Sequence, residues 1–120
     1  MEVDDLFERT YQFALRVIRL VRALPKTCEG NAVANQLVRA GTSVGANYRA
    51  ARRGRSRREF LAKLGVTHEE CDESAYWLRL IIDTKMLPDE QVKPLYDESI
   101  ELTKIFSKSR KTGRENDPDG

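Results

Sequence analysis

Helical periodicity, interrupted at a few positions by proline and glycine, is the feature that most constrains this chain. Apolar residues recur at spacings of three and four through four segments, whereas the alternation typical of a β-strand is nearly absent. The first segment runs from Val3 to Leu24 and the second from about Asn31 to Arg53; the third follows Ser56, and the last runs from about Asp89 to Lys111. We therefore expect four helices joined by short connections.

The connection between the second and third segments carries the clearest local signals. Gly54 is expected to adopt the left-handed conformation that closes a helix, with Arg52 and Arg53 in the last turn, where cations suit the helix dipole. Ser56 and Glu59 have the spacing of a capping box, which opens a helix. These signals predict a tight helical hairpin.

Long helices with short connections favour an all-α fold, an antiparallel up-down-up-down four-helix bundle around one core. Residues 1–111 form the expected single domain. Residues 112–120 have no apolar anchor and are expected to be a disordered tail. The structural alternative is one long helix or a coiled coil, and the proline and glycine positions argue against it.

Charge is divided unevenly along the chain. The 120 residues carry 21 Lys and Arg and 19 Asp and Glu, for a net charge of only +2. Residues 1–63 hold 13 basic and 6 acidic side chains (+7), whereas residues 64–120 hold 8 basic and 13 acidic ones (−5). Because positive charge is concentrated in the first half of the chain, a phosphate-binding surface is one interpretation of the sequence despite the near-neutral net charge.

Several classes of protein are disfavoured by the same sequence. The most apolar stretch, Phe13 to Leu24, is interrupted by three arginines, so no segment resembles a membrane span. The acidic N-terminus is unlike a signal peptide, and we expect a cytoplasmic protein with no membrane partner. Two cysteines cannot form a disulfide framework, and Cys71 lies on an apolar stripe, as a reduced core residue does.

A resemblance to a known family rests on the central segment. The matching residues are Gln36 to Ala40 with Arg39 among them, then Ser43, Asn47, and the run Arg55-Ser56-Arg57-Arg58-Glu59-Phe60. The segment resembles the four-helix-bundle proteins encoded within intervening sequences of bacterial 23S ribosomal RNA genes, a family similar to the accessory bundle of diversity-generating retroelements. Residues 69–80 and 95–110 also look like that family's third and fourth helices, so the resemblance covers nearly the whole chain.

The resemblance implies a left-handed bundle, a ring-like homopentamer and no established catalytic activity. For the retroelement relative it implies nucleic-acid binding and a reverse-transcriptase partner. One departure is visible: many members have Ile-Ala-Glu-Gly directly after the Asn, whereas here Asn47 precedes Tyr48-Arg49-Ala50-Ala51. Any work that the family's Glu does is therefore absent from this chain.

A cluster of basic residues spans the predicted hairpin. Arginine outnumbers lysine by 14 to 7 in the chain, and its planar guanidinium pairs bidentately with phosphate. The candidate phosphate-binding residues for RNA or DNA are Arg39, Arg49, Arg52, Arg53, Arg55, Arg57, Arg58 and Lys63. The alternative is that these residues pair with the acidic set Glu69, Glu70, Asp72 and Glu73, within one subunit or across an interface.

Other residues are assigned to structure and assembly. Asn47 falls on the apolar seam of the second helix, where a buried amide would specify register or assembly state. Ser43 is expected to bond the carbonyl one turn earlier. Tyr76 and Trp77 are candidate interface anchors, with packing at the core edge as the alternative for Trp77. Two small-residue faces on the second helix predict a subunit interface: Ala34, Gly41, Gly45, Ala46, Ala50 and Ala51.

No constellation points to catalysis, a metal or a cofactor. His68, Cys71 and Asp72 have suggestive spacing, but the chain contains only one His. The Glu69 to Glu73 carboxylates are explained more simply as a solvated face or as partners of arginine than as an acid–base pair. We expect a non-enzymatic, homo-oligomeric binding scaffold; the alternative is a protein–protein interaction module whose basic and acidic faces pair between subunits or with a partner protein.

Overall fold

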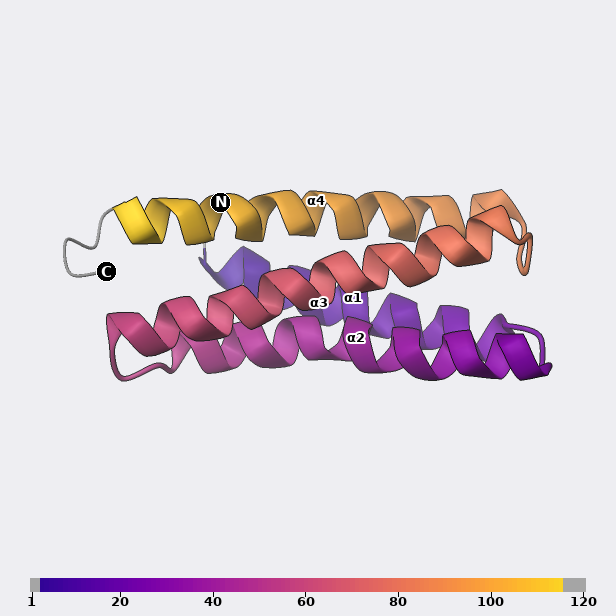
Figure 1. Cartoon of the computed structure of the whole chain (residues 1–120), viewed down its shortest axis with the longest axis horizontal. Helices are drawn as coiled ribbons and strands as arrows, with labels where there is room; N and C mark the ends of the chain where they lie inside the picture. Colours follow the sequence, from indigo (N-terminus) through magenta and orange to yellow (C-terminus); the bar gives the residue numbers. More distant parts are fainter. Residues whose placement is uncertain (1–2, 116–120) are drawn as a thin grey trace.

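The computed structural model describes residues 3–115, which form four helices (Figure 1). Helix α1 spans Val3–Ala23, α2 spans Cys28–Arg52, α3 spans Arg57–Asp83 and α4 spans Asp89–Glu115. No strand occurs within these residues. The predicted all-α class and the four-helix bundle are confirmed, while the left-handed sense of the bundle stays a prediction.

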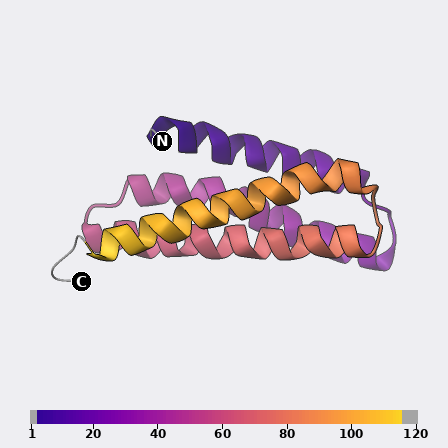
Figure 2. The ribbon, with the colours of Figure 1, turned by 90° about the horizontal axis from the view of Figure 1, so that it is seen from above.

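The chain reverses direction at each connection, so the bundle is a rod with extents of 49 × 22 × 20 Å (Figure 1). Each helix packs against its neighbours in sequence, and α1 also contacts α4. The α2–α3 connection and the last turns of α4 lie at the same end of the rod (Figure 1). Figure 2 shows that α1 and α4 diverge towards the two chain ends. Residues from distant parts of the sequence therefore meet at the end of the rod that holds the α2–α3 connection.

The core is one continuous apolar cluster to which all four helices contribute side chains. Tyr48 of α2 lies between two rings, with centroids 5.1 Å from Phe7 and 5.5 Å from Phe106. The largest fully buried apolar side chains are Phe13, Val17, Leu37, Val44, Leu64, Leu78, Ile81, Val92, Leu102 and Phe106. Most of these positions lie on the apolar stripes that periodicity predicts; near the end of α3, however, Ile81 is fully buried and the predicted stripe residue Ile82 only partly so.

The capping predictions for the hairpin are confirmed at Ser56 and corrected at Gly54. The Ser56 hydroxyl accepts a hydrogen bond from the Glu59 amide at 3.1 Å, and α3 begins at the next residue. Gly54 does not have a positive φ; its lack of a side chain matters because a Cβ there would lie 3.1 Å from the Ala51 carbonyl oxygen and the Phe60 nitrogen. The left-handed conformation belongs instead to Lys85 (φ 60°), in the α3–α4 connection.

Two helix boundaries differ from the sequence prediction. Helix α2 begins at Cys28 rather than near Asn31, because the Thr27 hydroxyl caps it by accepting the Gly30 amide at 3.1 Å. Helix α4 continues past Lys111 to Glu115, so residues 112–115 are helical and not part of a disordered tail. Residues 116–120 of that predicted tail lie outside the described residues.

The extra turn of α4 is held by contacts with α3. Gly113 is buried against Leu61, whose Cδ2 would lie 2.6 Å from a Cβ at Gly113. The guanidinium of Arg57 donates to the Gly113 carbonyl oxygen at 3.2 Å, which satisfies one of the carbonyls that a helix end leaves unpaired. Tertiary packing therefore extends a helix whose local sequence predicts an earlier end.

Two of the small residues of α2, Gly41 and Gly45, pack against α1 within the chain, while the subunit interface expected on the small-residue faces stays a prediction. A Cβ on Gly41 would lie 2.7 Å from Cγ2 of Val17, and one on Gly45 would lie 3.2 Å from the hydroxyl of Thr10. Both neighbours belong to α1. Helix α2 uses one face for α1 and another for α3, so two apolar faces require no second copy.

The close approach of Gly41 to Val17 predicts that replacing glycine with alanine has opposite effects on stability at Gly41 and at Gly65. Gly41→Ala is expected to destabilise the fold by about 1 to 2 kcal/mol, because overpacking against Val17 outweighs the gain in helix propensity. Gly65→Ala is the matched control, since its Cβ would make an ordinary 3.5 Å contact with Arg110; it is expected to stabilise by about 0.5 to 1 kcal/mol. Urea unfolding followed by circular dichroism measures both, and equal effects would contradict the packing.

Candidate nucleic-acid interface

Seven basic side chains gather at the α2–α3 hairpin, which we call the basic hairpin. They come from the last turn of α2, the connection and the start of α3, and all are exposed: Arg49, Arg52, Arg53, Arg55, Arg57, Arg58 and Lys63. Across residues 3–115, no carboxylate lies within ion-pair distance of any of them. Arg52 lies over the Phe60 ring at 5.7 Å, a cation–π contact that holds its stem without neutralising it.

The one acidic residue inside the basic hairpin is engaged with the backbone. A carboxylate oxygen of Glu59 accepts the Arg55 amide at 2.6 Å. In a capping box this carboxylate reaches the amide of the cap residue itself, whereas here it reaches the amide one position earlier. Glu59 therefore helps to shape the turn and makes no ion pair with a guanidinium of residues 3–115.

Arg39 differs from the other candidates because it is neutralised within the chain. Its guanidinium lies 3.4 Å from the Glu70 carboxylate and forms a second, shorter ion pair with Glu73. Glu73 also accepts the indole N–H of Trp77 at 3.1 Å. Pairing with the acidic set is thus confirmed for Arg39, while Glu69 and Asp72 make no ion pair with the residues the structure describes.

Trp77 and Tyr76 diverge in their surroundings. Trp77 is half-buried and packs on the core cluster, which is the core-edge alternative raised by its position in the sequence. Tyr76 meets it edge-on at a centroid distance of 4.9 Å and remains 59% exposed. Of the two aromatic residues, Tyr76 presents the more accessible surface.

Asn47 does not occupy the core position expected of it. It is half-buried, and its amide donates to the Ser43 carbonyl one turn earlier at 2.9 Å. Tyr48, one residue later, takes the buried position. The Ser43 hydroxyl donates to the Arg39 carbonyl at 2.6 Å, as predicted. The Asn47 N–H is thus satisfied within its own helix, and the role of Asn47 in assembly stays a prediction.

A second ion pair between an arginine and a carboxylate joins two helices, and the sequence did not indicate it. We call this ion pair the α1–α4 clasp. Arg9 of α1 makes a bidentate ion pair with Glu98 of α4, with contacts of 2.7 and 2.8 Å. Hydrogen bonding to Glu98 raises the pKa of Arg9, against the opposing effect of burial. This clasp joins the pair of helices that share the smallest interface in the bundle.

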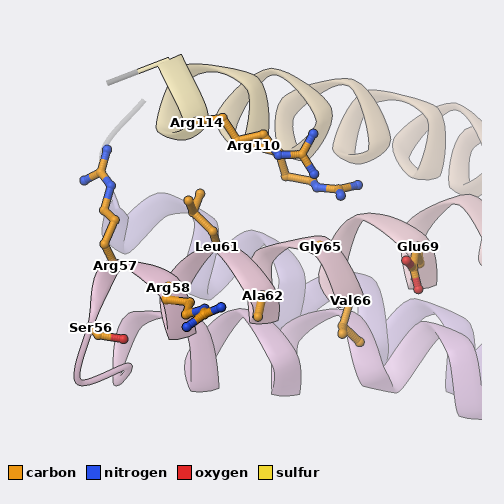
Figure 3. A pocket seen from close by; sticks show the side chains of 10 residues that line it. All are labelled: Ser56, Arg57, Arg58, Leu61, Ala62, Gly65, Val66, Glu69, Arg110 and Arg114. Carbon is orange, nitrogen blue, oxygen red and sulfur yellow. The ribbon is translucent and has the colours of Figure 1, made fainter. Parts of the chain in front are cut away.

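The end of α4 adds cations that sequence reasoning missed. Between Leu102 and Glu115 the helix carries five basic side chains and one acidic one. Two of them, Arg110 and Arg114, line a groove together with Arg57 and Arg58 of α3 (Figure 3). The predicted antiparallel order of helices was the available signal, because it places the end of α4 beside the start of α3.

The described residues hold no cluster of three or more His, Cys, Asp or Glu side chains able to ligate a metal. His68 Nδ1 accepts a hydrogen bond from Arg110 at 2.9 Å, since a guanidinium has only donors. Burial raises the pKa of the Cys71 thiol, which disfavours the reactive thiolate. None of the helices in the part of the chain described here is long and apolar enough to cross a membrane.

Comparison with known proteins assigns the family. The model of the 23S rRNA-intervening sequence proteins matches residues 4–108. The chain belongs to this family. A crystal structure of a protein with unknown function from the S23 ribosomal protein family of Bacteroides thetaiotaomicron is 32% identical, with a TM-score of 0.82, over 88% of this chain and 98% of that chain. No curated protein matches the chain.

The two cysteines of this family member are expected to differ sharply in reactivity. Cys28 is exposed at the start of α2, whereas Cys71 is buried with a raised pKa, so its thiolate fraction at pH 8 is lower than that of an ordinary cysteine. Titration with a chromogenic disulfide should modify Cys28 alone in the native protein and both residues in urea. Cys28→Ser should abolish the native reaction, and rapid native modification of that variant would contradict the burial of Cys71.

Proposed function

We propose that this protein is a non-enzymatic, homo-oligomeric scaffold whose basic hairpin contacts the phosphates of RNA or DNA. The observation that carries the proposal is the lack of carboxylate partners around the basic hairpin in the described part of the chain. Surface cations of this kind supply the sequence-independent part of nucleic-acid affinity by releasing counterions from phosphates.

Arginine chemistry and geometry support this proposal. Six of the seven cations in the basic hairpin are arginines, whose planar forks bind phosphate oxygens bidentately. Their mutual repulsion is relieved when a polyanion lies across them. Phe60, the aromatic side chain beneath Arg52, is half-buried and already covered by that guanidinium, so the proposal is for backbone contact without base reading. Arg39 is left out of the contact surface, because Glu70 and Glu73 already engage it.

The alternative function is a protein–protein interaction module. Exposed Glu69 and Asp72 have no ion-pair partner in residues 3–115 and offer a complement for the basic hairpin of another subunit or of a partner such as a reverse transcriptase. Homo-oligomer formation is favoured by Tyr11, 58% exposed beside a groove of about 510 Å³ between α1 and α2. The pentameric state is proposed from the family resemblance alone, and a cytoplasmic location from the sequence.

Removal of the charges on the α2 side of the basic hairpin is expected to abolish nucleic-acid binding. The variant Arg49→Ala, Arg52→Ala, Arg53→Ala and Arg55→Ala leaves the α3 arginines in place. Wild-type protein neutralising about five phosphates should show a log–log salt slope of about −4 on duplex DNA. The variant should lose most of this slope, as measured by fluorescence anisotropy with labelled RNA and DNA across a salt titration.

The matched control removes four cations elsewhere. Arg79, Lys85 and Lys93 pair with aspartates one turn away, and together with Lys104 they are replaced by Ala. This control should bind nucleic acid nearly as wild type does. Absence of wild-type binding at low salt would overturn the nucleic-acid proposal. A hairpin variant that loses its assembled mass in light scattering, with helicity intact, would support charge pairing between subunits instead.

A further inference from the structure

The groove between the start of α3 and the end of α4 is lined by four arginines. It has a volume of about 720 Å³, and its lining residues lie near the end of the bundle that carries the basic hairpin (Figure 3). Arg57 and Arg58 line it from α3, and Arg110 and Arg114 line it from α4; Glu69 is its only carboxylate. A volume of this size falls within the range of small-molecule sites.

Two of the four arginines are held in place by hydrogen bonds to neutral partners. Arg57 donates to the Gly113 carbonyl oxygen at 3.2 Å, and Arg110 donates to His68 Nδ1 at 2.9 Å. Neither contact neutralises the guanidinium, and each leaves most of its N–H donors unused within the described residues. Arg57 thus reaches from α3 to the backbone of α4, and Arg110 reaches from α4 to His68 of α3, while Arg58 and Arg114 also line the groove (Figure 3).

This arrangement places four like charges together, although the last turn of α4, which holds Arg114, is a position where the helix dipole favours a cation. Arg110 and Arg114 lie one turn apart on α4, a spacing at which like charges repel. Arg57 and Arg58 occupy the first turn of α3, where the positive end of the helix dipole favours acidic residues. A single monovalent anion cannot offset four guanidinium groups and a helix N-terminus. An anion with several adjacent charges can bridge both walls.

The groove also has an apolar floor. Leu61, Ala62 and Val66 line it beside the arginines, and Val66 is 39% exposed. Gly65 keeps space open beside the guanidinium of Arg110, which lies 3.5 Å from the position a Cβ would take. A ligand with a charged part and a flat, weakly polar part matches these two regions.

We propose that the α3–α4 groove binds a triphosphate group attached to a nucleoside. A triphosphate carries about three to four closely spaced negative charges near neutral pH, which matches the groove's excess of three positive charges, four arginines minus Glu69. The nucleoside would lie over the apolar floor. This inference goes beyond the proposed function, because the phosphodiesters within a nucleic-acid strand carry one charge each and are spread along the chain. The same triphosphate chemistry occurs in a free nucleotide and at the 5′ end of an RNA.

Calorimetry on the full chain, in EDTA so that no metal ion screens the phosphates, tests the groove with ATP and AMP. ATP is expected to bind saturably and at least about tenfold more tightly than AMP. The variant Arg110→Ala and Arg114→Ala should weaken ATP binding by about tenfold or more. The matched control Lys104→Ala and Lys108→Ala removes two exposed cations of the same spacing from the same helix, outside the groove, and should change affinity by less than about twofold.

Equal affinity for ATP and AMP, or equal losses in the groove variant and its control, would overturn the proposal. An RNA oligonucleotide carrying a 5′-triphosphate, compared with the same RNA carrying a 5′-hydroxyl, identifies the source of the group. Tighter binding of the triphosphorylated RNA, lost in the groove variant, supports the RNA end. If the wild-type protein does not bind ATP and the groove variant loses binding to 5′-hydroxyl RNA, the groove proposal is overturned. The basic hairpin proposal then still stands. ATP binding without any 5′-hydroxyl RNA binding would overturn only the basic hairpin proposal.

Discussion

The capped turn between α2 and α3 is the constraint on which the charge distribution of this protein depends. The Ser56 hydroxyl and the Glu59 carboxylate satisfy backbone amides at 3.1 and 2.6 Å, and an N-cap of this type is worth about 0.5 to 2 kcal/mol. Because Glu59 is engaged with the backbone, the turn brings seven cations together with no carboxylate of the described residues within ion-pair distance of them. Local helix capping thus creates the surface on which the proposed function depends.

Pairing, rather than net charge, distinguishes the arginines of this bundle. Arg9 and Arg39 are engaged by carboxylates on neighbouring helices, and they contribute to packing between helices. The cations of the basic hairpin have no such partners among residues 3–115, and the end of α4 adds further cations at the same end of the rod (Figure 1). A chain of net charge +2 therefore has one strongly basic end, which a division into sequence halves describes only in part.

Sequence patterns were sufficient for the features that depend on local chemistry. Periodicity located the four helices and most of their buried positions, and the Ser56 cap was predicted from spacing alone. On α2, the sequence placed Asn47 in the core, whereas the next residue, Tyr48, is the buried one. Both residues fall on helical stripes that lie one residue apart. The packing of Tyr48 between two aromatic rings decides which of them is buried.

Features that depend on contacts between distant segments could not be predicted from the sequence. The close fit of Gly41 against Val17 requires knowledge of which face of α2 meets α1. The extension of α4 to Glu115 depends on Leu61 and Arg57 of another helix, and the four-arginine groove appears only when those helices lie side by side.

The central claim is that the arginines of the basic hairpin are available to phosphate, whereas those paired within the bundle are not. Two-dimensional ¹⁵N–¹H spectra of arginine Nε–Hε groups test it directly, because Nε of Arg9 itself contacts Glu98 at 2.7 Å. During titration with a 5′-hydroxyl RNA oligonucleotide, the signals of Arg52, Arg53 and Arg55 should shift while that of Arg9 stays constant. Shifts at Arg9 and Arg39 with an unchanged hairpin would contradict the account.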